Sequence, residues 1–196
     1  THRQKKWFED HPAVDIYLTG NGEEPFQKIA DVWLKTHSLE KVKRAEIDGA
    51  HSYIDGKLHK TVLAQANDGY DQEPRVQNLF QTPSPYLKGY LDEFIADPKL
   101  NPLMESNRGC PFQCTFCADG ISAQNKIYKT DPKRFEAELN YIAERYKGKY
   151  LLIADDNFGM YPEDIEISKI IARCQERHDF PHHLQVCAGK NNQPRI

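Results

Sequence analysis

Three of the five cysteines in this chain stand close enough in sequence to share one metal centre. Cys110, Cys114 and Cys117 are separated by three and then by two intervening residues, in a segment that also contains Gly109 and Pro111. Thiolates are soft ligands that suit zinc and iron–sulfur centres. If the segment wraps round one centre, three thiolates leave a ligand position open, and an open position is where a substrate or cofactor binds.

Two kinds of metal centre compete for these cysteines. A closed structural zinc site needs four ligands, commonly as two separated pairs. The remaining cysteines are distant, because Cys174 falls in an apolar helical stripe and Cys187 in a strand, where cysteine is usually a small buried hydrophobe. His182 and His183 lie equally far downstream. The residues therefore favour a four-iron cluster with one iron free of protein ligands, and structural zinc or chance clustering are the alternatives.

Length and composition describe an ordinary globular chain of one large or two small domains. Its 196 residues are 39% hydrophobic and 28% charged, and 26 basic against 29 acidic side chains give a net charge of -3. This balance offers no obvious phosphate-binding surface, so nucleic acid is not an expected partner. No apolar run reaches about eighteen residues, so no membrane span is expected.

The cysteine usage predicts a reducing compartment. Five is an odd number, and three of these cysteines are too close together for a disulfide framework, so we expect reduced, metal-binding thiols in the cytoplasm. Residues 1–7 lack the apolar core of a signal peptide. The chain also lacks an initiator Met, and we expect it to be a fragment of a longer protein.

The cysteine segment lies in a region that predicts alternating strands and helices. Strands are expected at residues 103–106, 150–154 and 183–188, with helices beginning at Pro132 and Pro162. Such alternation is typical of a parallel βα architecture, in which polar groups gather at the carboxyl ends of the strands. The cysteines directly follow the first of these strands.

The front of the chain predicts a smaller α/β element. Residues 13–18 are expected to form a buried strand, followed by a glycine-rich turn at 19–24 and a helix from Pro25 to about Lys35. Its apolar stripe is expected to pack on a core, as half of a parallel α/β layer. The turn either cradles a phosphate or only connects the strand tightly to the helix. Residues 54–57 predict a two-residue hairpin.

The pattern Cys110-xxx-Cys114-x-Phe116-Cys117 resembles the signature of radical S-adenosylmethionine (SAM) enzymes. The resemblance implies a four-iron–four-sulfur (4Fe-4S) cluster on the three cysteines, with SAM chelating the unique iron and cleaved reductively to a 5'-deoxyadenosyl radical. It also implies an α/β fold, a partial (βα) barrel whose first strand precedes the cluster loop. An electron donor such as flavodoxin or ferredoxin is the implied partner.

The same resemblance implies a SAM contact after the second barrel strand, where relatives carry a Gly-Gly-Glu-like segment. This chain has Asp155, Asp156 and Asn157 there, and a carboxylate can accept hydrogen bonds from the SAM ammonium. Asp156 is the first choice, with Asp155 and Asn157 behind it. The alternative is an Asp/Asn turn that caps the next helix. Phe116 is expected either near the adenine or as a shield against solvent.

Three further segments resemble the cobalamin-dependent branch of that family: residues 14–26, 107–111 and 156–158. The resemblance implies that residues 1–62 are the C-terminal part of a Rossmann-like cobalamin-binding domain. Residues 63–100 are then a linker, and 101–196 the N-terminal part of the barrel. Cobalamin is a conditional expectation, because the lower-axial pattern Asp-x-His-x-x-Gly is absent from these residues and would lie upstream.

Together these features predict a radical SAM enzyme, or a fragment of one, in which cobalamin-dependent methyl transfer is one outcome. No residue is assigned a catalytic role, and no substrate is identified. The alternatives are a non-catalytic iron–sulfur electron-transfer module and a zinc-bound structural domain.

Overall fold

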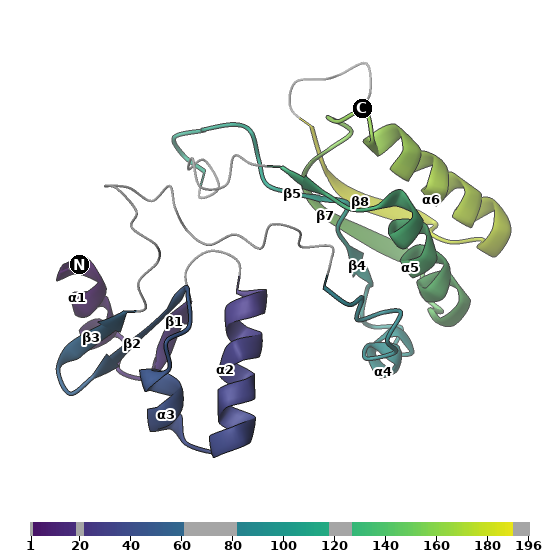
Figure 1. Cartoon of the computed structure of the whole chain (residues 1–196). Coiled ribbons are helices and arrows are strands. Elements are labelled where there is room, and N and C mark those ends of the chain that lie inside the picture. The colour runs from purple at the N-terminus through teal and green to yellow at the C-terminus, as the bar shows by residue number, and fades with distance from the viewer. Residues whose placement is uncertain (1, 19–21, 61–81, 118–126, 190–196) are drawn as a thin grey trace. The chain divides into compact units, whose positions relative to one another are not determined.

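The computed structural model describes residues 2–18, 22–60, 82–117 and 127–189, and the chain forms two compact units, Thr1–Gln77 and Asn78–Ile196. Figure 1 labels the elements of both. The first unit contains helices α1 (His2–Asp10), α2 (Glu23–Thr36) and α3 (Leu39–Arg44) and strands β1 (Ile16–Leu18), β2 (Ala50–Ile54) and β3 (Lys57–Lys60).

The three strands of the first unit form an antiparallel sheet in the order β1-β2-β3. Ile54 pairs with Lys57 across the β2–β3 turn, which confirms the predicted two-residue hairpin. Asp55 and Gly56 both have positive φ, 50° and 74°, as a tight turn between twisted strands requires. The prediction of a parallel layer is wrong for β1, because its partner β2 runs antiparallel to it. A strand followed by a helix does not by itself choose the strand's neighbour.

Helix α2 forms where it was predicted, but its apolar stripe does not lie in a core. Pro25 is its buried residue, whereas Phe26 and Leu34 are 64% and 66% exposed and Trp33 is also exposed. The expected buried strand before it is likewise half-buried or exposed. Helical periodicity identified the face correctly, whereas burial depends on a partner that the described residues do not supply.

The second unit carries the cysteine segment. Its helices are α4 (Asp92–Ile95), α5 (Pro132–Arg145) and α6 (Asp164–His178), and its strands are β4 (Leu103–Met104), β5 (Asn107–Arg108), β6 (Tyr128–Lys129), β7 (Tyr150–Phe158) and β8 (His183–Ala188). Strands β4, β7 and β8 pair in parallel in that order, which confirms the predicted βα alternation. Helices α5 and α6 lie on one face of this sheet (Figure 1).

A hydrophobic core lies between those two helices and the sheet. Phe135, Leu139 and Ile142 of α5 are fully buried against Leu151 of β7, and α6 contributes Ile167, Ile170, Ile171 and Cys174. Residues 82–100, expected to be linker, also contribute, since Tyr86 and Ile95 are buried in this core and the Tyr86 hydroxyl donates to the Leu103 carbonyl at 2.8 Å. The assignment of domains itself stays a prediction.

Strand β7 is longer than the sequence predicted. It continues through Asp155, Asp156 and Asn157 to Phe158, and α6 begins only at Asp164. The alternative interpretation of these residues as a helix-capping turn is therefore wrong. A register irregularity between Ile153 and Phe158 accompanies the extension.

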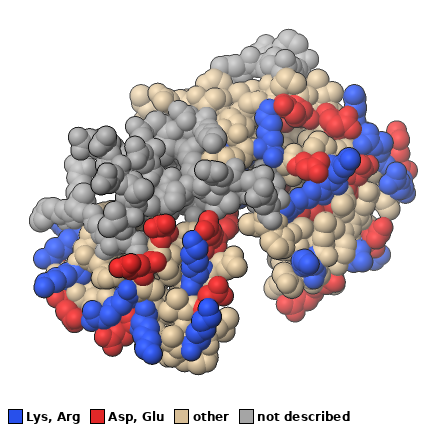
Figure 2. Space-filling view, in the orientation of Figure 1, with Lys and Arg blue, Asp and Glu red and all other residues tan. Residues whose placement is uncertain are grey.

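Two surface properties bear on function. Acidic and basic side chains are interspersed on the face that Figure 2 shows. Among the described residues, no helix is both long enough and apolar enough to cross a membrane.

Candidate metal centre

The cysteine segment begins and ends at a small antiparallel ladder. Strand β5 leads into it and β6 follows it, with Asn107 paired to Lys129 and Arg108 paired to Tyr128. The Thr130 amide also donates to the Ser106 carbonyl at 2.9 Å. The ladder therefore fixes both ends of the segment next to the carboxyl end of β4.

A buried carboxylate anchors the start of the segment. Asp155 is 1% exposed, and its Oδ1 accepts the backbone N–H groups of Ser106 at 2.7 Å and Asn107 at 3.1 Å. Its Oδ2 accepts the Asn107 side-chain amide at 2.7 Å and the Ser106 hydroxyl. These four bonds join the end of β7 to the residues that lead into the cysteine segment.

Two opposing effects set the charge of Asp155. Burial raises its pKa to about 6, while the donors from Ser106 and Asn107 lower it and the nearby Asp164 carboxylate raises it. Burial prevails, although at neutral pH the carboxylate is still mainly ionised. Asp155 was predicted as a SAM contact, and in this structure both of its oxygens bind the chain itself.

Cys110 is the most enclosed cysteine of the motif. It is 4% exposed, and the side-chain amide of Asn157, itself fully buried, donates to its Sγ at 3.2 Å. Asn157 belongs to β7, two residues beyond Asp155. The second strand of the sheet therefore holds the cysteine segment at two points.

The structure does not bring the three cysteines together as a ligand set. Cys114 and Cys117 are half-buried, and the Cys117 amide donates to the Cys114 carbonyl at 3.0 Å. Within the ranges that the structure describes, no three His, Cys, Asp or Glu side chains are arranged to hold a metal ion. All five cysteines are free thiols, so the chain retains the thiols that a centre would need.

The cysteines outside the motif behave differently from each other. Cys174 is buried in α6, as predicted, and burial raises its pKa to about 11. Cys187 is exposed on β8, so the prediction of a buried strand residue is wrong there. The candidate metal ligands therefore remain the three clustered thiols of Cys110, Cys114 and Cys117.

The other two predicted contacts lie in accessible positions. Asp156 is half-buried, between the buried Asp155 and Asn157. Phe116 is 90% exposed, directly before Cys117. Their roles stay predictions.

Unpaired polar atoms gather round Cys110, and the sequence did not indicate them. Within the described residues, Oδ1 of Asn107, Oδ1 of Asn157 and the Tyr161 hydroxyl are buried without a hydrogen-bond partner. Burial, followed by the negative charges of Cys110 and three aspartates, raises the pKa of Tyr161 to about 12. Buried atoms of this kind are rare in a complete site. Together with three free thiols, they fit a centre that a bound group completes.

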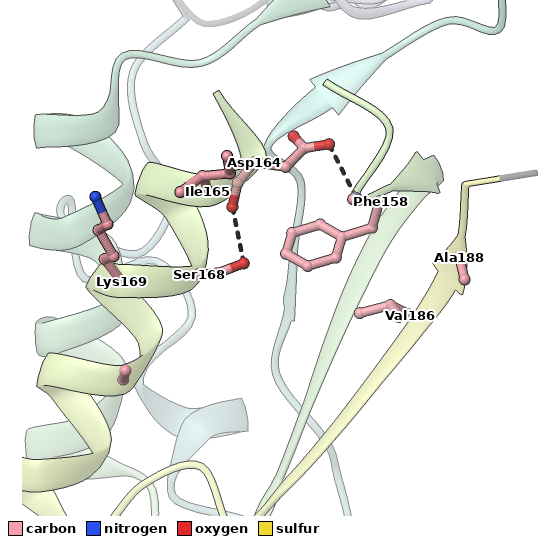
Figure 3. Close-up of a pocket in the computed structure, with 9 residues that line it drawn as sticks. Phe158, Asp164, Ile165, Ser168, Lys169, Val186 and Ala188 are labelled. Carbon is pink, nitrogen blue, oxygen red and sulfur yellow. Dashed lines mark hydrogen bonds between the residues drawn. The ribbon is translucent and has the colours of Figure 1, made fainter. Parts of the chain in front are cut away.

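A separate pocket lies between α6 and strands β7 and β8 (Figure 3). Its volume is about 500 Å³, and it is lined by Phe158, Val186 and one face of α6. Asp164 beside it accepts the backbone N–H groups of Gly159 and Tyr161, both at 2.9 Å. This carboxylate, which lines the pocket, therefore already binds two donors of its own chain. None of the predicted site residues lines it.

The missed residues carry few local signals. Ser106 and Asn107 stand next to the cysteine motif, but their partner Asp155 is almost fifty residues away. Tyr161 follows a strand without any motif. Proximity to the cysteine segment was the one signal available, and it applied to Ser106 and Asn107 alone.

Comparison with known proteins extends over almost the whole chain. The chain is 30% identical over 200 residues to the cobalamin-dependent radical SAM methyltransferase TokK of Streptomyces tokunonensis, covering 99% of this chain and 27% of that protein. It is 28% identical, with the same coverage, to the 2-(S-pantetheinyl)-carbapenam-3-carboxylate methyltransferase of Streptantibioticus cattleyicolor. The chain thus spans about a quarter of the length of the curated relatives it matches. No protein-family model matches it.

Among solved structures, the fold resembles the radical SAM methyltransferase TsrM of Kitasatospora setae, solved with cobalamin and a [4Fe-4S] cluster bound. The TM-score is 0.55 at 12% identity, covering 88% of this chain and 32% of that one. The predicted resemblance to the cobalamin-dependent branch of the radical SAM enzymes is confirmed by the two curated relatives, and the likeness to TsrM shows the fold.

Proposed function

We propose that this chain is the cluster-binding part of a cobalamin-dependent radical SAM methyltransferase. The observation that carries the proposal is the cysteine motif at the carboxyl end of the first parallel strand, in a chain similar to TokK along 99% of its length. The cysteine motif lies within the part of the chain that is similar to TokK. The transfer of a methyl group by the whole protein is part of the proposal.

The fold proposal is finer than the observed parallel sheet. Residues 101–196 form the first βα units of a partial barrel and residues 1–62 the C-terminal part of a Rossmann-like cobalamin-binding domain. Residues 63–100 connect the two, and residues 82–100 of this connection pack into the core of the second unit. The likeness to TsrM supports the α/β fold, and the parallel order β4-β7-β8 supports the start of a barrel. Cobalamin is part of the proposal because residues 1–62 are assigned to a cobalamin-binding domain.

Cys110, Cys114 and Cys117 hold a 4Fe-4S cluster in this proposal. When bound, such a cluster would supply one electron to SAM. Cys110, which lies beside Asn157, and the half-buried Cys114 and Cys117 would provide its three thiolates. The chain's own contribution is to exclude water from the first sulfur and to fix where the segment starts.

Asp156 is the proposed contact for the SAM ammonium. Its carboxylate lies on the same stretch of β7 as the Cys110 partner Asn157 and remains half-exposed. A charged carboxylate accepting an ammonium N–H forms one of the stronger hydrogen bonds in proteins. Asp155 serves as the buried anchor, and the exposed ring of Phe116 is available to cover the adenine.

The cellular setting follows from the same chemistry. Free thiols and an oxygen-sensitive cluster suit the reducing cytoplasm, and reduction requires a one-electron donor such as flavodoxin or ferredoxin. We include both in the proposal.

Anaerobic reconstitution of the chain with iron and sulfide tests this function. We expect about four iron and four sulfide per chain and a broad absorbance band near 400 nm, as [4Fe-4S] proteins show. With SAM and a reductant, we expect 5'-deoxyadenosine. Cys114→Ala should lose the cluster, while Cys187→Ala, which removes an exposed cysteine outside the motif, should keep it.

The alternatives give different results in the same experiment. Stoichiometric zinc without sulfide in anaerobically purified protein would indicate a structural zinc domain. A cluster that never cleaves SAM would indicate an electron-transfer module. Retention of the cluster in Cys114→Ala would contradict the ligand assignment.

A further inference from the structure

We propose that Asn157 is a positioning residue that makes the cluster easier to reduce, through the hydrogen bond from its side-chain amide to the Cys110 sulfur. This inference rests on the proposed function, because it requires Cys110 to be a cluster ligand. It assigns Asn157 a role different from the SAM contact that the sequence suggested.

The contact is enclosed. Asn157 is fully buried and Cys110 is 4% exposed, and Nδ2 lies 3.2 Å from Sγ across 47 residues of sequence. The Asn157 Oδ1 has no partner within the described residues. Within the described residues, the side chain of Asn157 therefore makes its hydrogen bond to the Cys110 sulfur through Nδ2, and its Oδ1 makes none.

The orientation of the amide follows from the state of the sulfur. A cysteine that binds iron is a thiolate and carries no proton. It can only accept a hydrogen bond, so the amide N–H must face it and the carbonyl oxygen must point away.

The donor is held in place by strands rather than by a loop. Asn157 lies in β7, which pairs with β4 on one side and β8 on the other. Two residues earlier, Asp155 binds Ser106 and Asn107, at the start of the segment that carries Cys110. One strand thus fixes both the donor and the approach of the acceptor.

A fixed donor changes the reduction equilibrium. Adding an electron to a cluster increases the negative charge on its sulfurs, so a hydrogen bond to a ligand sulfur stabilises the reduced state more than the oxidised state. Removing the donor should lower the equilibrium constant for reduction about tenfold. For a one-electron couple, tenfold corresponds to about 59 mV towards more negative potential.

The test is an electron paramagnetic resonance (EPR) redox titration of the reconstituted 196-residue chain with dithionite. Asn157→Leu removes the donor at similar size, and we expect its midpoint to be more negative than that of the native chain. Asn101→Leu is the control, since it removes a hydrogen bond with Tyr146 away from the cysteines and should leave the midpoint unchanged.

A second measurement does not depend on a variant that folds. We expect the native reduced cluster, in protein labelled with ¹⁵N at its asparagine side-chain amides, to show a ¹⁵N hyperfine coupling by pulsed EPR. An unchanged midpoint in Asn157→Leu would overturn the inference, and so would a native cluster without this coupling. A native chain that takes up no cluster would instead overturn the proposed function itself.

Discussion

Asp155 is the residue whose side chain ties the end of β7 to the start of the cysteine segment. It gathers four donors from Ser106 and Asn107 around a carboxylate that is 1% exposed. Burial nevertheless raises its pKa from 3.8 to about 6, so its charge is costly in the folded protein. The residue fixes the segment at the expense of stability near neutral pH.

The raised pKa of Asp155 gives the protein a predictable pH dependence. The folded state binds this proton more tightly than the unfolded chain, so the free energy of unfolding should fall as pH rises from about 4 to about 7. A rise from 3.8 to about 6 corresponds to about 3 kcal/mol, at about 1.36 kcal/mol per pKa unit.

Urea unfolding across this pH range, compared between the native chain and Asp155→Asn, measures the effect. The Asn variant cannot ionise, and it can still pair with Asn107, whose unpartnered Oδ1 can turn to accept the new amide. We expect its stability to depend less on pH than that of the native chain. Equal slopes in the two proteins would show that Asp155 is not the source.

Tyr161 gives a second prediction about a single residue. Its hydroxyl is buried without a partner in the described residues, and an unsatisfied buried hydroxyl costs about 1–3 kcal/mol. Tyr161→Phe should therefore stabilise the metal-free chain, by about 1 kcal/mol, in thermal or urea unfolding. A loss of stability would mean that the hydroxyl makes a hydrogen bond in solution. Tyr141→Phe, which loses a bond to Asp92 at 2.8 Å, is the matched control and should not stabilise the chain.

At the scale of secondary structure, the cysteine segment is held in position by the elements before and after it. Strands β5 and β6 pair at its base, and α5 begins directly afterwards. The Asp131 side chain caps α5 by accepting the Lys133 amide at 3.0 Å. Helix α5 in turn supplies three fully buried residues to the core. The loop is therefore anchored to the most closely packed part of this unit.

Loss of that cap should be measurable. Asp131→Ala removes the side-chain acceptor of α5 and should lower the free energy of unfolding by about 1 kcal/mol. Asp131→Ser keeps an acceptor at the same position and should retain most of it. Chemical denaturation of both variants tests this prediction, and equal losses in Ala and Ser would rule out the capping bond as the cause.

At the scale of the whole molecule, the chain consists of two compact units with separate interiors. The core cluster belongs entirely to Asn78–Ile196, while Phe8, Val42 and Ile47 are buried in Thr1–Gln77. Both tryptophans of the chain, Trp7 and Trp33, lie in the first unit. Tryptophan fluorescence therefore reports on that unit alone.

This distribution allows the two interiors to be tested separately. Leu139→Ala should destabilise the second unit by about 2–5 kcal/mol, because Leu139 is fully buried. The urea transition followed by circular dichroism should shift, while the fluorescence transition should not. Phe8→Ala should shift the fluorescence transition, together with the part of the circular dichroism change that comes from α1, α2 and α3 of the first unit. A shift of the fluorescence transition in Leu139→Ala would contradict independent unfolding.

Local sequence was sufficient for several of the elements and for locating the three clustered cysteines. Proline at helix starts, apolar periodicity and a two-residue turn predicted α5, α6, the parallel strands and the hairpin, because these signals act within a few residues. The cysteine spacing likewise identified the motif that resembles the radical SAM signature.

Tertiary structure decided which polar groups meet and which apolar faces are covered. Asp155 meets Ser106, and Asn157 meets Cys110, across 49 and 47 residues, so no local pattern could pair them. For the same reason, periodicity in α2 predicted an apolar face but not its exposure. The sequence by itself determined the three thiols and the strand that precedes them. Only the packing of β7 against β4 decided that a buried amide donates to the first of those sulfurs.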